Sequence, residues 1–247
     1  MTNPRAPRLC VLIDADNIPA HYAEPIFEEV ASLGEASVRR IYGDWSAQRL
    51  NRWAEKVSHL GLVADQQFSN VKGKNASDIG LVIAAMDFMH SGLFDGFVLV
   101  SSDSDFTRLA ARIREQGLDV YGIGEKKTPE AFRMACKRFI YVENLVPQQA
   151  SAPEPAPKSG EPPAPKQNHT KEPPTNATPL IVNAMWAIDP EGEWYSLGQV
   201  GQYITQAMPD FDSRTYGAAK LSDLARKIPR FEVRQAPTGQ LEVRDIT

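Results

Sequence analysis

Aspartate residues follow two apolar segments of this 247-residue sequence, and their carboxylates are the groups best suited to chemistry. Leu9–Ile13 is an uninterrupted apolar run that ends at Asp14, and Phe97–Val100 is a second run that is followed by Asp103 and Asp105. Such runs are typical of strands buried on both faces of a parallel sheet. Ligands of open parallel sheets bind beyond the carboxyl ends of the strands. We therefore expect the two groups of aspartates to face one crevice.

Other acids extend this candidate site. Asp16 follows Asp14 in the first turn, Asp78 lies early in a predicted helix, and Asp87 lies about two and a half turns further along that helix. Carboxylates gathered at one place repel each other unless a cation neutralises them. Oxygen ligands without a His or Cys set favour Mg²⁺ or Mn²⁺ over zinc. Each aspartate taken alone fits a helix cap or a turn equally well.

Strand-like and helix-like segments alternate between residues 8 and 146. This alternation predicts an α/β domain with a mainly parallel sheet and helices on both of its faces. The expected strands cover 9–13, 36–42, 62–68, 97–100, 119–124 and 139–142. The expected helices cover 24–33, 46–60, 77–89, 106–116 and 129–136.

Two of these helices carry specific expectations. Ser46 is expected to be the N-cap of the second helix. The third helix is expected to start at Ser77 and to turn a set of apolar side chains toward the core, namely Ile79, Val82, Ile83, Met86 and Met89.

The composition changes at Pro147. Ten of the 19 prolines lie between Pro147 and Pro179, among small and polar residues. Such a segment has too little apolar surface to offset its ordering entropy, so residues 147–178 are predicted to be a disordered linker.

The residues that follow the linker predict a second, smaller domain at 179–246. Helical segments at 179–187, 197–208 and 213–226 precede two alternating segments at 231–234 and 241–244. Gly217 weakens the start of the third helix, and Gly239 lies in the turn between the two strands. Three helices and a hairpin are the outline of a winged helix, an α+β fold.

Charge and apolar content exclude several classes of protein. The formal net charge is −4, which excludes a protein that coats nucleic acid by bulk positive charge. Cys10 and Cys136 lack a CxxC or His-rich neighbourhood and are expected to be buried thiols. The apolar stretches are shorter than a membrane span requires, and the N-terminus lacks an apolar targeting core. A cytoplasmic protein without membrane contact is expected.

The aspartate motifs resemble those of a known family. Ile13–Asn17 resembles the opening D-x-x-N motif of NYN domains, a LabA-like branch of the PIN-like nucleases. Gly73–Asp78 followed by Leu81–Asp87 is similar to the middle motif, and Val100–Phe106 to the third, S-x-D-x-D-F. The resemblance covers about residues 8–146. It implies a PIN-like three-layer sandwich that cleaves RNA with the help of a metal ion.

The resemblance also implies roles for individual residues. Asp14, Asp78, Asp103 and Asp105 match the catalytic, metal-binding acids, while Asn17 organises the first turn. Asp16 stands where many members have Gly, which leaves open whether Asp14 or Asp16 faces the metal; Asp14 is favoured. Asp87 is a supporting residue that fits a helix surface equally well.

The C-terminal segment resembles a second family. Phe211–Gly217 running into Lys220–Leu224 is similar to the OST-HTH/LOTUS domain, over about residues 178–246. This resemblance implies a winged helix that binds RNA or a protein partner.

RNA also needs positive groups near the acids. Lys72, Lys74 and Asn75 precede Asp78, and Arg108 follows the third motif, so these four are the candidate RNA contacts. A solvated loop is the simpler interpretation of the first three.

The function that accounts for most of these features is a Mg²⁺- or Mn²⁺-dependent ribonuclease, endonucleolytic in action, with a tethered RNA- or partner-binding domain. One alternative is a non-catalytic RNA-binding or scaffold protein on a nuclease-like fold. A second is a phosphatase or nucleotide hydrolase that uses the same acidic crevice. The sequence leaves the RNA substrate and the oligomeric state open.

Overall fold

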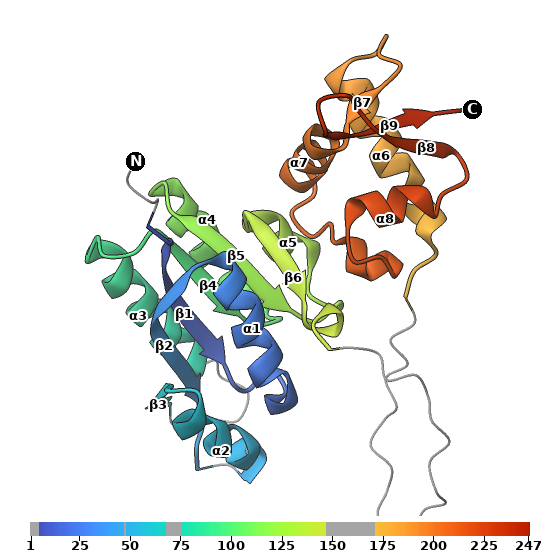
Figure 1. Cartoon of the computed structure of the whole chain (residues 1–247). Coiled ribbons are helices and arrows are strands. Elements are labelled where there is room, and N and C mark those ends of the chain that lie inside the picture. The colour runs from blue at the N-terminus through green and yellow to red at the C-terminus, as the bar shows by residue number, and fades with distance from the viewer. Residues whose placement is uncertain (1–4, 47, 68–75, 147–170) are drawn as a thin grey trace, which may run out of the picture. The chain divides into compact units, whose positions relative to one another are not determined.

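Six parallel strands form the central sheet of the larger folded unit (Figure 1). The computed structural model describes residues 5–46, 48–67, 76–146 and 171–247. The strands lie in the order β3-β2-β1-β4-β5-β6. They are β1 (Arg8–Asp14), β2 (Glu35–Gly43), β3 (Val63–Gln66), β4 (Gly96–Val100), β5 (Asp119–Gly124) and β6 (Arg138–Tyr141). The expected α/β class is therefore confirmed.

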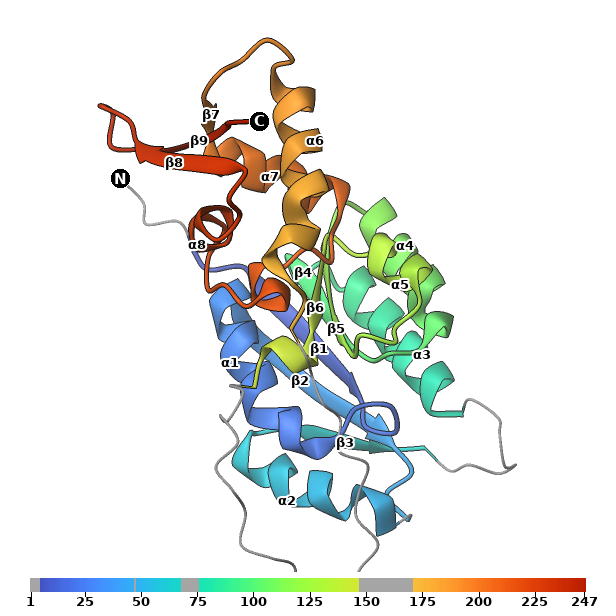
Figure 2. The same ribbon diagram turned by 90° about the vertical axis from the view of Figure 1, so that its right-hand side faces the viewer.

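Helices cover both faces of this sheet, as Figure 2 shows with the sheet seen near its edge. One face carries α1 (Ala23–Leu33) and α2 (Asn51–His59). The other face carries α3 (Ala76–His90), α4 (Thr107–Glu115) and α5 (Glu130–Ala135). The unit also contains the short 3-10 helices η1 (Ala20–Tyr22), η2 (Gln48–Leu50), η3 (Ser104–Phe106) and η4 (Val142–Asn144).

The apolar run of β1 explains the two cores. Successive strand residues point to opposite faces of a sheet. Ile13 accordingly packs in the core beneath α1 and α2, together with the fully buried Trp53. Leu12 packs in the core on the other face, together with Leu81 and Phe106. A central strand between two layers of helices has no polar face, which is why its sequence is apolar throughout.

Two expectations about the helices were wrong. Ser46 caps no helix: its hydroxyl donates to Asp44, and α2 begins only at Asn51 after a 3-10 turn. On α3 the expectation fails for Ile79 and Ile83, whose exposed fractions are 63% and 57%. It holds for Met89, which is buried, and for Val82 and Met86, which are partly buried against the same core as Leu81 and Ala85. The helix is apolar around most of its circumference, so the spacing of its apolar residues does not indicate which side faces the sheet.

The C-terminal unit combines short helices with a small antiparallel sheet. Its helices are η5 (Pro174–Ala177), α6 (Thr178–Ile188), α7 (Leu197–Ala207), η6 (Ser213–Tyr216) and α8 (Leu221–Arg226). Its strands are β7 (Tyr195–Ser196), β8 (Phe231–Gln235) and β9 (Leu241–Asp245), paired in the order β7-β9-β8. The predicted hairpin is β8-β9, with Gly239 at its turn in a left-handed conformation (φ 84°).

The predicted third helix of this unit is interrupted. Gly217 adopts a left-handed conformation (φ 71°) that ends η6, and α8 starts four residues later. The predicted linker lies outside the described residues from 147 to 170, while its last residues enter η5 and α6. Within the described ranges, none of the helices combines the length and the apolar character needed to cross a membrane.

Candidate metal centre

The candidate acids lie at the point where the strand order of the sheet changes direction. The chain leaves β1 toward β2 and β3 on one side, and toward β4, β5 and β6 on the other. At β1 and β4, Ile13 pairs with Val100, which places Asp14 next to Ser101 at the carboxyl edge. Helices on opposite faces diverge from such a switch point, so the strand ends are accessible to a ligand there.

Asp14 is the innermost acid, with 1% of its surface exposed. Its Oδ2 accepts hydrogen bonds from Asn17 Nδ2 at 2.6 Å and from Ser101 Oγ at 2.9 Å. Its Oδ1 accepts a hydrogen bond from the backbone N–H of Asp16 at 3.2 Å. Burial raises the pKa of Asp14, and the Asn17 and Ser101 hydrogen bonds oppose that rise. Asp14 therefore holds the first turn in place from within the protein.

Asp103 and Asp105 lie on the turn that leaves β4. Asp103 caps η3, because its carboxylate accepts a hydrogen bond from the backbone N–H of Asp105 at 2.9 Å. The backbone N–H of Asp103 in turn donates to Ser101 Oγ at 3.1 Å. Asp103 is half-buried and Asp105 is exposed. The cap that the sequence offered as an alternative role for Asp103 thus exists, and it leaves that carboxylate at the edge of the site.

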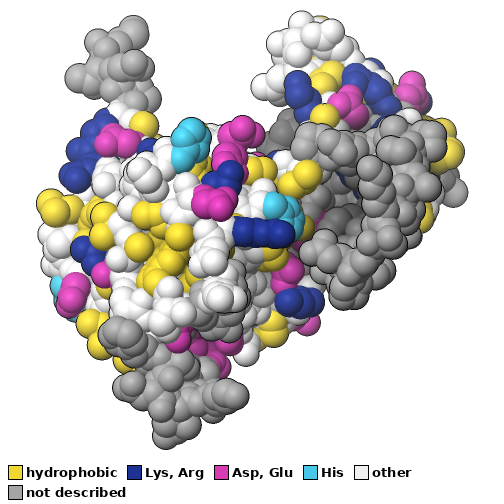
Figure 3. Space-filling model, turned by 90° about the horizontal axis from the view of Figure 1, so that it is seen from below, with side chains coloured by type: hydrophobic (Ala, Val, Ile, Leu, Met, Phe, Trp, Pro, Cys, Tyr) yellow, Lys and Arg dark blue, Asp and Glu magenta, His cyan; other side chains and the backbone are white. Residues whose placement is uncertain are grey.

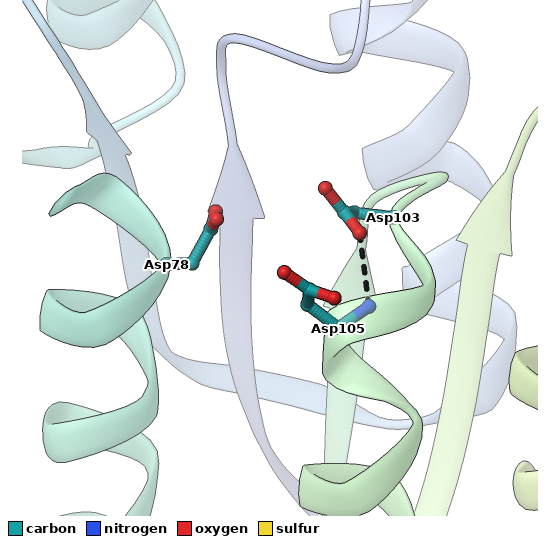
Figure 4. Close-up of side chains that lie close together, drawn as sticks. All are labelled: Asp78, Asp103 and Asp105. Atoms are coloured by element: carbon teal, nitrogen blue, oxygen red, sulfur yellow. Dashed lines mark hydrogen bonds between the residues drawn. The ribbon is translucent and has the colours of Figure 1, made fainter. Parts of the chain in front are cut away.

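Asp78 lies near Asp103 and Asp105 but comes from another element, the helix α3. It lies in the first turn of α3, and it is buried. Figure 4 shows Asp78 projecting from α3 toward Asp103 and Asp105, beside the end of β1. One carboxylate oxygen from each of the three residues lies within 4.8 Å of the others. Asp78, Asp103 and Asp105 form an acidic triad, in which one acid comes from α3 and two come from the turn after β4.

The electrostatics of the triad favour a bound cation. The pKa of Asp78 is raised to about 6, chiefly by burial and then, in decreasing order, by the charges of Asp14, Asp103, Asp105 and Asp16. A carboxyl group that is hard to ionise near other carboxylates gains most from a positive charge placed among them. The donor set consists of carboxylate oxygens alone, which suits Mg²⁺ or Mn²⁺. The residues present therefore fit a hard divalent ion.

The remaining predicted residues fall at different distances from this triad. Asn17 contacts Asp14 rather than the triad, and Asp16 is half-buried beside it in the same turn. Asp87 is exposed, nine residues beyond Asp78 on α3. Arg108 is exposed in the first turn of α4. Lys72, Lys74 and Asn75 lie outside the described residues.

Comparison with protein families assigns the larger unit. The NYN domain model matches residues 8–143, which is more than half of the chain. The chain belongs to the NYN domain family. A second model, that of the OST-HTH/LOTUS domain, matches residues 169–243. Both resemblances identified in the sequence are confirmed.

Similar solved structures and curated proteins add little detail. A crystal structure of a protein of unknown function from Vibrio parahaemolyticus RIMD 2210633 has a TM-score of 0.47 and 19% sequence identity. The similar region covers 56% of this chain and 94% of the Vibrio chain. The comparison with curated proteins finds no match.

Ser101 is the residue of the NYN site to which the sequence analysis gave no role. Its hydroxyl donates to Asp14 and accepts from the backbone of Asp103, so it links the ends of β1 and β4. A signal was present in the sequence, because Ser101 is the first polar residue after the apolar run of β4. Its partner Asp14 lies 87 residues away, and only the pairing of the two strands shows the contact.

Proposed function

We propose that the NYN domain is a Mg²⁺- or Mn²⁺-dependent ribonuclease that cuts RNA chains internally. The observation that carries the proposal is the acidic triad, whose three oxygens lie within 4.8 Å of one another at the switch point of the sheet. A divalent ion held there lowers the pKa of a bound water and stabilises charge on a scissile phosphate. The family to which the chain belongs supports RNA as the substrate.

Each residue of the site has its own role in the proposed reaction. Asp78, Asp103 and Asp105 hold the ion, and Asp105, the most exposed of the three, also orients the attacking water. Asp14 adds negative charge behind the ion, while Asn17 and Ser101 fix the direction of its carboxylate. Because Asp14 and Ser101 sit at adjacent strand ends, they also keep the two acidic turns together.

The OST-HTH domain is proposed to bind RNA or a protein partner. Several of its basic side chains already have local acidic partners: Arg214 pairs with Asp212, and Arg230 pairs with Asp245. Such pairs reduce the positive potential available to phosphates, so the winged helix is not a strongly basic surface. A protein partner is therefore as consistent with this domain as RNA is.

Cleavage assays with a matched pair of variants test the proposal. Wild-type protein, Asp103→Asn and Asp87→Asn are incubated with end-labelled single-stranded and structured RNA in Mg²⁺, Mn²⁺ or EDTA. We expect wild type and Asp87→Asn to release internal fragments only with metal, and Asp103→Asn to be inactive although folded. Asn is as good an N-cap as Asp, so the cap of η3 survives in Asp103→Asn.

Two results would contradict the ribonuclease. Full activity of Asp103→Asn would remove this carboxylate from the mechanism. RNA binding without cleavage in any metal would favour the non-catalytic RNA-binding protein instead.

A further inference from the structure

A hollow of about 480 Å³ opens beside the metal centre. Three segments line it: the turn after β1 with η1, the start of α2 and the loop after β5. Asn17 belongs to both places, since it lines the hollow and its side chain also donates to Asp14. The hollow therefore begins where the first acidic turn of the metal centre ends.

One wall of the hollow is apolar and firmly held. Ile18, Leu50 and Trp53 contribute to this wall, and all three are buried. Trp53 Nε1 donates a hydrogen bond to the backbone oxygen of Ile18 at 2.8 Å, which ties α2 to the turn after β1. Because these side chains are packed in the core, the wall is formed before any ligand arrives.

The rim carries two positive side chains. Arg52 is exposed on the first turn of α2 and forms no ion pair with another residue in the described ranges. Lys127 Nζ lies 2.5 Å from Oε2 of Glu125, a residue with only 8% of its surface exposed. The backbone N–H of Glu125 donates to Ser102 Oγ at 2.9 Å, which fixes the base of this loop beside β4. Glu125 thus positions a lysine at the rim but offsets part of its charge, so Arg52 is the stronger positive group there.

Basic, acidic and apolar side chains lie close together on the described part of the face that includes the carboxyl ends of the strands (Figure 3). A long polyanion is not held there by a broad positive surface. Local groups must bind it instead, and an apolar wall flanked by Arg52 and Lys127 supplies contacts both for a base and for a phosphate.

We propose that this hollow binds one unpaired nucleotide of the RNA, adjacent to the phosphate at the metal centre. The inference rests on the proposed ribonuclease function and adds a subsite to it. The base packs against the apolar lining, in which Pro19 is exposed while Ile18 and Trp53 are held below the surface. Arg52 and Lys127 bind the phosphate of the same nucleotide. A base within a duplex is stacked and paired, so it cannot enter a pocket of this size.

Binding is measured separately from cleavage. All proteins carry Asp103→Asn, so that the RNA stays intact whether or not the wild type cuts it. Fluorescence anisotropy in Mg²⁺ compares a labelled single-stranded 12-mer with a blunt duplex of the same sequence. The added substitutions are Arg52→Glu, Arg52→Lys and Lys127→Glu, with Arg112→Glu as a charge-matched control on α4. Arg112 is also an exposed arginine, but it lies outside the hollow.

We expect Arg52→Glu to raise the Kd for the single strand about tenfold or more, and Lys127→Glu to raise it by a smaller factor, because Glu125 already offsets part of the lysine charge. Arg52→Lys and Arg112→Glu should stay within about twofold of the background, and the duplex should bind weakly to all of them. Because the OST-HTH domain offers a second RNA surface, a 12-mer containing one 4-thiouridine is also cross-linked and the attached peptides are sequenced. Cross-links within residues 15–21 or 50–53 support the subsite.

Some results would overturn the subsite. Cross-links confined to other segments, with Arg52→Glu binding as tightly as Arg112→Glu, would exclude the hollow. Mononucleotides that bind as tightly as the 12-mer would assign it to a free nucleotide rather than to an RNA chain. If Arg52→Glu lost binding and the wild type did not cleave RNA, the nucleotide subsite would stand and the ribonuclease function would be wrong. If the wild type cleaved RNA and both Arg52→Glu and Lys127→Glu bound it normally, the ribonuclease function would stand and the nucleotide subsite would be wrong.

Discussion

Ser101 Oγ donates a hydrogen bond to Asp14 Oδ2 at 2.9 Å and thereby joins the ends of β1 and β4. The same oxygen accepts the backbone N–H of Asp103 at 3.1 Å. One hydroxyl thus connects Asp14, the buried acid of the first turn, to Asp103, the half-buried member of the acidic triad. The site is therefore assembled across the sheet, and its geometry depends on a residue that is not itself an acid.

The first prediction concerns this hydroxyl. Ser101→Ala removes one hydrogen bond from a buried carboxylate and the acceptor of the Asp103 N–H, so the free energy of unfolding should fall by about 1–3 kcal/mol. Urea denaturation measures the change, with Ser104→Ala as the control, because Ser104 is exposed on the same turn. The control should change the free energy by less than about 0.5 kcal/mol. Equal effects of the two substitutions would contradict the linking role of Ser101.

The second prediction concerns the pH dependence of stability. The pKa of Asp78 is about 6 in the folded protein, above the ordinary value of 3.8. Between about pH 4 and pH 6 the folded state keeps a proton that the unfolded state has lost, so stability decreases as the pH rises through this window. Above about pH 6 the full penalty of the ionised carboxylate is present.

Asp78→Asn should remove this penalty. In EDTA at pH 8 the variant should be more stable than wild type, by on the order of 1–3 kcal/mol, whereas near pH 4 the difference should largely vanish. Thermal melting at several pH values measures it, with the exposed Asp87→Asn on the same helix as the control. A constant difference across this pH range would show that the titration of Asp78 is not its cause.

The third prediction concerns metal. A divalent ion that binds only the folded protein stabilises it by about 2.7 kcal/mol at a concentration of 100 times its Kd. Mg²⁺ or Mn²⁺ should therefore raise the Tm above its value in EDTA, and less so at pH 5 than at pH 8, because Asp78 must lose its proton to bind. Calorimetry with Mn²⁺ gives the affinity.

The control for the metal is a triple variant, Asp78→Asn, Asp103→Asn and Asp105→Asn, which retains Asp14 and Asp16. It should show no rise in Tm with metal. If its response matched that of the wild type, the ion would bind at another place in the chain.

The sequence predicted the two acidic turns correctly because a strand buried on both faces must be apolar, and the first acids after such a strand mark its end. This holds for Asp14, the last residue of β1, and for Asp103 and Asp105 after β4. The side of α3 that faces the sheet could not be predicted in the same way. Its apolar residues surround the helix, and only packing against the sheet shows that Asp78 is turned inward while the adjacent Ile79 is exposed.

The relation of Asp14 to the other acids also depends on tertiary structure. Spacing along the chain places it among the metal ligands as readily as Asp103. Asp14 is not one of the three acids of the triad, because its carboxylate is held by Asn17 and Ser101. Ser101 is brought close to it only by the pairing of β1 with β4. Similarly, the hollow beside Asn17 is lined by three segments that the sequence separates by about 30 residues or more.

The fourth prediction concerns the OST-HTH domain, where Gly217 ends η6 with a φ of 71°. A Cβ at this position would meet its nearest neighbour, Lys171 Cδ, at 3.5 Å, an ordinary van der Waals contact. Gly217→Ala therefore strains the backbone rather than the packing, and the left-handed conformation should cost about 1–2 kcal/mol.

Gly198→Ala is the matched control in the first turn of α7, where a helical alanine should be neutral or slightly stabilising. Chemical denaturation followed by Trp fluorescence compares the two variants. Because Gly217 lies outside the NYN domain, the rise in Tm with Mn²⁺ should be the same in both; equal stability of the two variants would contradict the strained conformation of Gly217.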